Sequence, residues 1–447
     1  MLLKEALDLA IGFMRQGKPD DAAKILDGIL IHEPKNPLAL YLLGSVAVEK
    51  GIYGTAKILL ERAVAVDPQA DWAWHNLGIT HKATQNMQKA EECYRKSLKL
   101  NPERQDTMAM MAGCFVNAGC PEKAIEWADK SLKIDPECPH AWNHKALALL
   151  ELEKWEEGWD AWERRWNVPE RARMARSYDC PKWDGAPLNG VLVIHGEQGL
   201  GDEILYMTCF NDLKKAVGPD CEIVIESATR LVPLFKRSFG VRVYGTEEEV
   251  KANEKPDAWL SMGSLPALYR RSKSSFKSPG KILHPDPARV SYYRDLLDER
   301  SNGPHIGLGW YGGVAKTHSK LRNAPLNLWK DLITDNFISV QYNTGDTQTE
   351  ADAIGVHHIP SAVRDFDDLT ALIEACDHII TVCQTAHHMS GALIKPCWTL
   401  VPSAPAWRYG LTGKKNIWYP SVTQYRQEGD DWKSVLKKVK QDLGKIA

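Results

Sequence analysis

The stretch His195-Gly196-Glu197-Gln198-Gly199-Leu200-Gly201-Asp202-Glu203 follows the apolar run Val191-Leu192-Val193-Ile194 and precedes a helical pattern that ends at Gly218-Pro219. A strand, a glycine turn and a helix in this order are how α/β domains present a ligand at the carboxyl edge of a parallel sheet. Gly199 and Gly201 let the backbone approach a ligand, and Asp202 lies where the helix dipole favours an ionised carboxylate. We expect half of a binding site here, with Asp202 as a proton acceptor.

The same residues also have a purely structural interpretation. Asp202 could simply cap its helix, and the glycines could only form a tight turn. The spacing of Gly196, Gly199 and Gly201 differs from the dinucleotide-binding pattern G-x-G-x-x-G. Both interpretations stay open on this stretch alone, so the rest of the chain has to decide between them.

Towards the N-terminus, prolines recur every 34 residues, at Pro34, Pro68, Pro102 and Pro136. A fixed period of this length predicts stacked two-helix units. Small residues fall in phase with the prolines, where two helices must approach closely. They are Ala22, Ala56, Ala90, Ala124, Gly44 and Gly78. Together with Trp74 and Leu77, the pattern resembles the tetratricopeptide repeat, whose arrays bind extended partners in a groove.

A fifth unit starts near Pro139 and then departs from the pattern. Gly158 takes the alanine position, and four tryptophans lie within residues 155–166. Terminal repeats must cover a face that has no further neighbour, so we expect these rings to cap the array against the next domain. Stacking on carbohydrate is the alternative interpretation.

Residues 167–187 are expected to form a linker. The segment combines prolines with an arginine cluster and with Trp183, a side chain that favours burial. The clustered arginines are Arg171, Arg173 and Arg176. We therefore expect the linker to dock on the following domain rather than to swing freely.

Strand and helix patterns alternate through the C-terminal two thirds, which predicts two halves, each with a parallel sheet. A segment rich in Ser, Lys and Pro at 270–287 marks the boundary between the halves. The second series includes a strand at 305–310, a helix at 326–333 and a strand at 398–401. The last helix, apolar on one face from Trp432 to Leu443, is expected to brace the first half.

Two places in the second half suit an anionic ligand. A helix opens at Gln384-Thr385 directly after a strand, so its free N–H groups and the Thr385 hydroxyl can face a phosphate, with His388 one turn further on. The turn Gly312-Gly313 is followed by two cations, Lys316 and Arg322. We expect the two groups to converge on one sheet edge, although each residue alone has an ordinary structural explanation.

Two apparent motifs are discounted. Asp365-Phe366-Asp367 matches a D-x-D metal pattern, but Asp367 and Asp368 lie where a helix cap belongs. His357-His358 lies in a short strand pattern whose alternation sends the rings to opposite faces. No zinc-protease, P-loop or nucleophile-elbow motif is present, and we predict no metal site.

The composition describes an ordinary soluble surface. The 447 residues carry a net charge of -2, which does not indicate nucleic acid as a partner, although a local basic patch would be hidden in the total. No apolar run is long enough to span a bilayer, and the first residues do not form a secretory signal. The ten cysteines form no C-x-x-C pair and are expected to be reduced. We therefore predict a cytoplasmic protein.

Taken together, the motifs resemble tetratricopeptide-repeat proteins with a C-terminal GT-B glycosyltransferase domain related to the heptosyltransferases. The resemblance spans almost the whole chain, and its motifs occur in order. They include Trp183-Asp184-Gly185, the stretch 196–203, Trp310-Tyr311-Gly312-Gly313, His388-Met389-Ser390-Gly391 and Trp407-Arg408-Tyr409. The fold class implied is α plus α/β: a repeat solenoid followed by two Rossmann-like halves.

The resemblance implies transfer of a sugar from a nucleotide diphosphate sugar to an acceptor hydroxyl, inverting and metal-independent, with no bound cofactor. Asp202 would be the general base. The departing diphosphate would be neutralised by Lys316, Arg322 and the helix at Gln384-Thr385 with His388. One departure is that Cys383-Gln384 stands where these relatives usually carry Asp-Thr, which alters a donor contact.

The predicted domains are the repeat array with its capping unit at 1–166, the linker at 167–187, an acceptor half at 188–290, a nucleotide-sugar half at 291–425 and a C-terminal helix at 426–447. The repeats would position the acceptor, which could be a glycan, a lipid-linked glycan or a polypeptide. The alternative, favoured by Cys383-Gln384, is a non-catalytic repeat scaffold with a degenerate glycosyltransferase domain.

Overall fold

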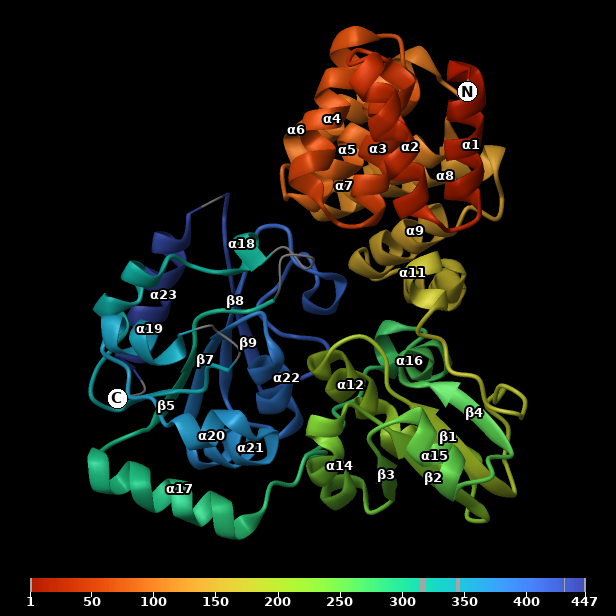
Figure 1. Cartoon of the computed structure of the whole chain (residues 1–447). Coiled ribbons are helices and arrows are strands. Elements are labelled where there is room, and N and C mark those ends of the chain that lie inside the picture. Colours follow the sequence, from red (N-terminus) through yellow and green to blue (C-terminus); the bar gives the residue numbers. More distant parts are fainter. Residues whose placement is uncertain (1, 314–318, 343–345, 430, 446–447) are drawn as a thin grey trace. The chain divides into compact units, whose positions relative to one another are not determined.

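The computed structural model describes residues 2–313, 319–342, 346–429 and 431–445. The chain divides into two compact units, residues 1–149 and 150–447. The first unit is helical, and the second contains two sheets with helices around them (Figure 1).

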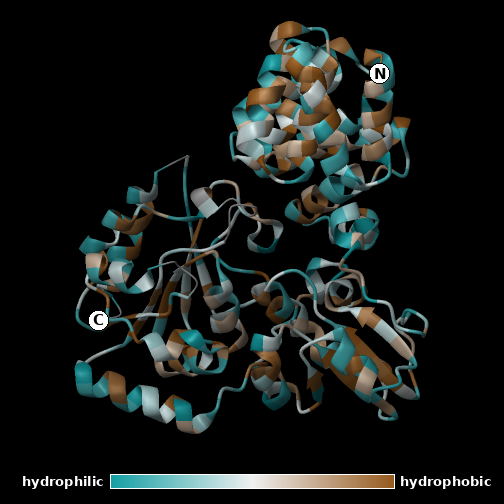
Figure 2. Ribbon diagram, in the orientation of Figure 1, coloured by the Kyte–Doolittle hydropathy of each residue, from teal (hydrophilic) through white to brown (hydrophobic). Residues whose placement is uncertain are grey.

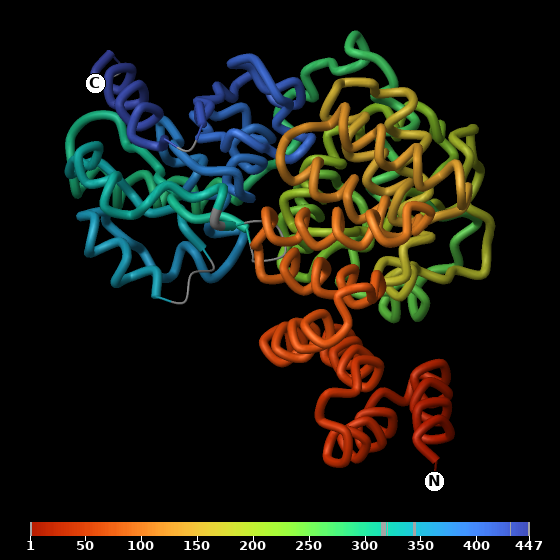
Figure 3. Tube along the Cα trace, turned by 90° about the horizontal axis from the view of Figure 1, so that it is seen from above, coloured from red at the N-terminus to blue at the C-terminus, as the bar shows by residue number. Residues whose placement is uncertain are grey.

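The first unit is a solenoid of helix pairs, as the proline period predicts. Figure 3 follows the chain through successive pairs, from red to orange. The helices are α1 (Leu3–Arg15), α2 (Pro19–His32), α3 (Pro37–Glu49), α4 (Tyr53–Val66), α5 (Asp71–Ala83), α6 (Met87–Leu100), α7 (Gln105–Asn117), α8 (Pro121–Ile134) and α9 (Pro139–Glu151). The in-phase alanines are fully buried. A Cβ on Gly78 would lie 2.4 Å from the Tyr94 ring, which explains why this position has no side chain.

The second unit begins with a tryptophan-rich segment that packs against the α/β fold. It comprises α10 (Trp155–Trp162) and the 3-10 helix η1 (Glu163–Asn167). The indole of Trp159 donates to the Arg270 carbonyl at 2.8 Å, and that of Trp162 donates to the Gly263 carbonyl at 3.0 Å. Both rings are buried and contact Trp407. Their faces are therefore covered by protein, so these two rings cannot stack on carbohydrate.

The first sheet has four parallel strands in the order β3-β2-β1-β4. Apolar residues dominate β1 and β2, which makes these strands largely brown in Figure 2. The strands are β1 (Gly190–His195), β2 (Cys221–Glu226), β3 (Arg242–Tyr244) and β4 (Ala258–Ser261). The helices are α11 (Pro169–Ala172), α12 (Leu200–Tyr206), α13 (Phe210–Val217), α14 (Val232–Phe239), α15 (Glu247–Asn253) and α16 (Leu265–Tyr269).

The second sheet has five parallel strands in the order β6-β5-β7-β8-β9. They are β5 (Ile306–Gly309), β6 (Phe337–Ser339), β7 (His378–Val382), β8 (Cys397–Val401) and β9 (Val422–Arg426). The helices are α17 (Pro287–Arg300), α18 (Ser319–Arg322), α19 (Thr347–Ile354), α20 (Pro360–Arg364), α21 (Phe366–Ala375), α22 (Thr385–Ala392) and α23 (Trp432–Leu443). Both sheets are parallel, as the alternation of strands and helices predicts.

Several local predictions are wrong. The helix expected at 326–333 is two 3-10 turns, η7 (Leu326–Leu328) and η8 (Lys330–Leu332), and the strand β9 was not foreseen. The N-cap of α21 is Asp365 and not Asp367 or Asp368. The Asp365 side chain accepts a hydrogen bond from the Asp367 backbone N–H.

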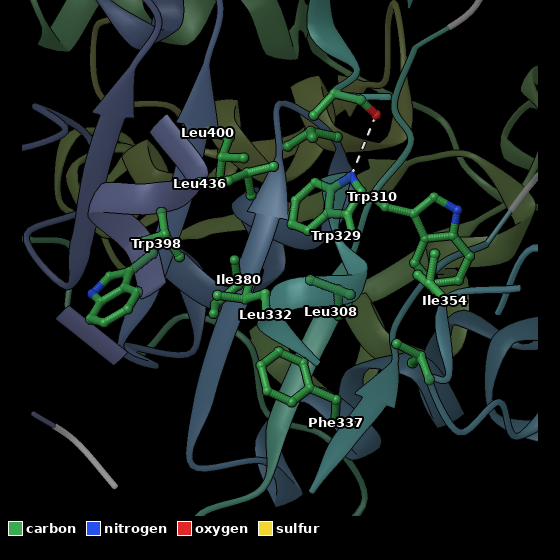
Figure 4. Packing of buried hydrophobic residues seen from close by; sticks show 14 of the residues in the cluster. Leu308, Trp310, Trp329, Leu332, Phe337, Ile354, Ile380, Trp398, Leu400 and Leu436 are labelled. Carbon is green, nitrogen blue, oxygen red and sulfur yellow. Dashed lines mark hydrogen bonds between the residues drawn. The ribbon is translucent and has the colours of Figure 1, made fainter. Parts of the chain in front are cut away.

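The last helix also differs from expectation, because α23 packs on the core of its own half rather than bracing the first half. Its residues Trp432, Leu436 and Val439 join a cluster that includes side chains from β5, β7 and β8. Figure 4 shows Leu436 beside Leu400, with Leu308 and Ile380 nearby on neighbouring strands. An apolar helix face covers the nearest uncovered side of a sheet, and here that sheet is the second one.

Candidate functional site

A cavity of about 340 Å³ lies between the two halves of the α/β unit. Residues from the turn and first turn of helix after β1 line it, together with residues that follow β5, β6, β7 and β8. The lining residues are Gly199, Leu200, Gly201, Asp202, Tyr311, Gly312, Gly313, Arg322, Tyr342, Cys383, Gln384, Thr385, His388, Arg408 and Tyr409. All described members of the predicted site therefore lie around one cavity. Lys316 lies outside the described residues.

The glycine turn of the first half serves close packing. Its left-handed residue is Gln198, with φ of 66°, and not one of the glycines. A Cβ on Gly201 would lie 2.7 Å from the Cδ2 atom of His388, and one on Gly196 would lie 2.6 Å from the Glu203 carboxylate. Gly201 thus lets α12 pack directly on α22, which brings the two halves together at the cavity.

Both carboxylate oxygens of Asp202 are engaged. Oδ2 accepts from the Gly199 backbone N–H at 3.2 Å, and Oδ1 forms an ion pair with Arg408. Asp202 therefore caps the N-terminus of α12 by accepting this hydrogen bond, as the structural interpretation predicts. The same carboxylate also lines the cavity, so capping and a role at the cavity are compatible.

On the opposite wall, α22 begins directly after β7. The Gln384 side chain donates to Thr381 Oγ1 at 2.9 Å, and the Tyr342 hydroxyl donates to Thr385 Oγ1. A Cβ on Gly312 would lie 2.7 Å from the Cys383 carbonyl, so the glycine turn can lie tightly against this strand end. Gly313 adopts φ of 80°, a backbone conformation that favours glycine. The backbone N–H groups at the start of α22 remain suited to an anion.

His388 is buried, and its Nδ1 lies 3.4 Å from the Tyr419 hydroxyl. Burial, together with the nearby His387 and the positive charge of Arg408, lowers the pKa of His388 well below its ordinary value. The imidazole is therefore neutral at neutral pH. It can contribute a hydrogen bond and packing, but not positive charge.

The available positive charge comes from arginine. Arg322 ends α18, lines the cavity and has no hydrogen bond or ion pair with the described part of the chain. Among the described residues, Asp202 is the one charged partner of Arg408. A diphosphate could therefore contact the Arg322 guanidinium and compete with Asp202 for that of Arg408.

Cys383 is a packing residue. Its thiol donates to the Leu400 carbonyl at 3.5 Å, and burial raises the pKa of the thiol to about 12. The side chain is therefore protonated and chemically inert at neutral pH. The Cys383-Gln384 pair fills space and orients Thr381 rather than presenting a carboxylate.

Sequence reasoning missed Arg408, Tyr342 and Tyr409 as cavity residues. Arg408 and Tyr409 lie in the 3-10 helix η9 (Trp407–Tyr409), which follows β8, and Tyr342 follows β6. Arg408 and Tyr409 belong to the motif Trp407-Arg408-Tyr409, which contributes to the family resemblance but was given no role at the site. All three residues also follow the carboxyl end of a strand.

Two further properties concern the described residues alone. No group of three or more His, Cys, Asp or Glu side chains there is arranged to hold a metal ion. Across the same ranges, no helix combines the length and the apolar character needed to cross a membrane.

Comparison with protein families identifies the repeats. The tetratricopeptide repeat model matches residues 7–71, and the model for the anaphase-promoting complex, cyclosome, subunit 3 matches residues 83–164. Among solved structures, a crystal structure of MamA is 21% identical, with a TM-score of 0.32, and the match covers 37% of this chain and 97% of MamA. The protein TTC0263 of Thermus thermophilus is 16% identical, with a TM-score of 0.34, over 38% of this chain and 93% of that protein.

Among curated relatives, protein FlbA of Caulobacter vibrioides is similar along most of the chain. It is 26% identical over 444 residues, which cover 93% of this chain and 74% of FlbA. A DnaJ homolog subfamily C member 7 homolog of Schizosaccharomyces pombe is 29% identical, over 32% of this chain and 34% of that protein. The N-terminal part of this chain is thus an array of tetratricopeptide repeats, a scaffold suited to protein interaction, and an α/β unit with two parallel sheets follows it.

Proposed function

We propose that the chain is a protein-binding scaffold whose repeat array holds an extended segment of a partner protein. The observation that carries this proposal is the stacking of the first helices of successive repeats: α1 contacts α3, α3 contacts α5, and α5 contacts α7. Such stacking makes a continuous surface along one side of the array.

The partly exposed Asn76 side chain is available to recognise a peptide backbone, and contacts between the stacked helices hold this region in place. The Asn76 amide of α5 donates to the Ser45 hydroxyl of α3 at 2.7 Å, and His75 Nδ1 lies 2.7 Å from the Thr107 hydroxyl of α7. An amide such as that of Asn76 can donate to and accept from a peptide group at the same time. These contacts between repeats keep the side chains in fixed positions before a partner binds.

The test is selection of peptides from a displayed random library against the full chain. We expect selected peptides to bind Asn76→Ala at least about tenfold more weakly, because a hydrogen bond is lost from an ordered surface. Lys99→Ala, on an exposed position of α6, is the matched control and should bind normally. Equal binding to both variants would remove the surface around Asn76 from this role.

A second candidate function is glycosyl transfer by the α/β unit as a GT-B enzyme. The observation that favours it is the convergence of Asp202, Arg322 and the start of α22 around one cavity between the two halves. Parallel sheets bind ligands at their carboxyl edges, and facing edges would bring a donor and an acceptor together.

In this reaction an acceptor hydroxyl oxygen attacks the anomeric carbon, the bond from that carbon to the diphosphate breaks, and the nucleoside diphosphate leaves. The hydroxyl proton passes to Asp202, while Arg322 and the N–H groups of α22 stabilise the departing charge. Arg408 holds Asp202 in the structure. A bound diphosphate would offer Arg408 another anion and so free the Asp202 carboxylate to accept the proton.

Calorimetry with a panel of nucleoside diphosphates, followed by product analysis with the matching nucleotide sugars, separates the two candidates. A transferase would bind one nucleotide and release it from the sugar. Asp202→Asn would then abolish release while keeping affinity, and Arg322→Gln would weaken affinity. Absence of both binding and release would leave the scaffold function alone.

A further inference from the structure

A second cavity, of about 390 Å³, lies at the carboxyl edge of the first sheet. It is lined by residues that follow three neighbouring strands: Gly196 after β1, Ser227 after β2 and Gly245 after β3. Within the described ranges, no residue lines both this cavity and the one between the halves. Because the carboxyl edge of an open parallel sheet is where α/β proteins bind ligands, this position is suited to a second site.

The linker supplies the rest of the lining, including its arginine cluster. The linker residues are Arg171, Arg173, Met174 and Arg176, and Trp166 of η1 lines the cavity with them. Neither proposed function uses these side chains. Their position at the cavity accounts for the three arginines that lie so close together in this segment of the second unit.

Two of the acidic residues in the lining are already paired. Glu226 accepts from Arg176 at 2.6 and 2.8 Å and from the Tyr178 hydroxyl at 2.8 Å. Glu197 accepts from Arg165 at 2.6 and 2.9 Å. Their negative charges are therefore balanced within the protein and do not repel an anion.

The third acidic residue, Glu203, is 4% exposed and accepts from the Ala228 backbone N–H at 3.1 Å. Burial raises the pKa of Glu203 to about 8. At neutral pH this carboxyl group is therefore mostly protonated and adds a hydrogen-bond donor instead of a charge.

Positive charge remains in excess. Arg171 Nη1 is buried and has no hydrogen-bond partner among the described residues, while its guanidinium lies 5.1 Å from the centre of the Trp162 ring. Arg173 is exposed and has no ion pair within the ranges that the structure describes. Arg171 also lines the cavity and is partly exposed, so the part of its guanidinium that faces the cavity can bind an oxyanion, which fits its planar fork.

We propose that this cavity binds the carboxylate or phosphate group of a small ligand, with Arg171 and Arg173 as its cationic partners and Trp166 as an apolar wall. The site does not depend on nucleotide binding in the other cavity. Its ligand is an acidic small molecule, because a neutral compound of the same shape offers Arg171 and Arg173 no opposite charge.

The test is calorimetric titration of the full chain at low salt with glucose 6-phosphate, glucuronate and glucose. We expect one of the two anionic sugars to bind and glucose not to bind, and the preferred anion identifies phosphate or carboxylate as the ligand group. Arg171→Gln and Arg173→Gln should each weaken binding about tenfold, the loss of one charge-assisted hydrogen bond. Circular dichroism checks folding, and the exposed Arg173 provides a variant that leaves the core untouched.

Two matched variants locate the binding. Arg300→Gln changes an exposed arginine of α17 that does not line the cavity, and Arg322→Gln changes the other cavity. Both should bind the anionic sugar as the wild type does. The proposal is overturned if neither anion binds, if both linker variants bind normally, or if only Arg322→Gln loses binding.

Discussion

Asp202 of α12 and Arg408 of η9 form an ion pair that joins the two halves of the α/β unit. The side chains are 19% and 13% exposed, respectively, so the pair is largely removed from water. Because each residue comes from a different half, the contact stabilises their approach at the cavity. The same contact places the candidate base next to a cation that a ligand anion could attract.

Removal of one partner of this pair should destabilise the unit. We expect Asp202→Asn and Arg408→Gln each to lower the free energy of unfolding by about 1–3 kcal/mol, less than for a fully buried pair because some exposure remains. The double variant should cost less than the sum of the two, which a double-mutant cycle in urea measures. Glu428→Gln, which breaks an exposed pair with Lys438, should change stability by less than about 1 kcal/mol. Strict additivity at Asp202 and Arg408 would contradict a direct contact.

The packing of α12 on α22 leads to a second prediction. A Cβ on Gly201 would lie 2.7 Å from His388 Cδ2, and His388 is itself enclosed by Tyr409 and Tyr419. We expect Gly201→Ala to cost about 1–3 kcal/mol, because the helices must move apart. In Gly199→Ala the nearest atom lies at 3.4 Å, an ordinary contact, so this control should cost less than about 1 kcal/mol in the same denaturation measurement. A similar cost for both variants would mean that the helices do not meet at Gly201.

The sequence predicts those features of the structure that depend on residues close together in the chain. The repeat period predicts that Gly78 and the in-phase alanines are buried, because the two helices of each repeat pack closely at the same positions. Strand and helix alternation likewise predicts two parallel sheets. These patterns are local, and a single sequence displays them directly.

Contacts between segments far apart in the chain produce no local sequence pattern. Nothing near Asp202 predicts Arg408, which lies 206 residues further along the chain, and nothing near Arg165 predicts its pairing with Glu197. The predicted position of α23 was also wrong. An amphipathic pattern indicates that one face of a helix is buried, but it does not indicate which sheet that face packs on. The convergence of the site residues could be expected only because parallel strands bring their carboxyl ends to one edge.

The Arg165–Glu197 pair provides a third prediction. Arg165 is fully buried and also donates to the hydroxyls of Ser261, at the end of β4, and Ser264. We expect Arg165→Gln to cost about 3–5 kcal/mol, because Glu197 is left buried without its charged partner. Adding Glu197→Gln should recover part of that loss. Arg271→Gln breaks exposed pairs with Glu156 and Asp160 and should cost less than about 1 kcal/mol. If Arg165→Gln and Arg271→Gln lower stability equally in thermal unfolding, burial of an ion pair does not determine how much it contributes to stability here.

The buried Glu203 provides a prediction on pH. Its pKa is raised by burial to about 8 in the folded state, against 4.5 for an ordinary Glu. The folded state therefore holds more protons between these values, so this group's contribution to stability is complete below about pH 4.5 and is lost as the pH rises to about 8. Within the window its slope is at most about 1.4 kcal/mol per pH unit. Glu203→Gln should remove this slope in urea unfolding from pH 5 to 8, whereas the exposed Glu248→Gln should keep it. An unchanged slope in Glu203→Gln would show that the carboxyl group ionises freely.

The repeat array allows one further prediction, in which two glycines respond with opposite sign. In α5, a Cβ on Gly78 would lie 2.4 Å from the buried Tyr94 ring, so Gly78→Ala forces a rigid side chain to move and should cost about 1–3 kcal/mol. In α2, a Cβ on Gly28 meets nothing within 4 Å. Gly28→Ala should therefore stabilise by roughly 0.5–1 kcal/mol, since alanine loses less backbone freedom in a helix. Chemical denaturation of the full chain, followed at the repeat transition, measures both. If the two variants shift that transition in the same direction, close helix approach does not explain the glycine at position 78.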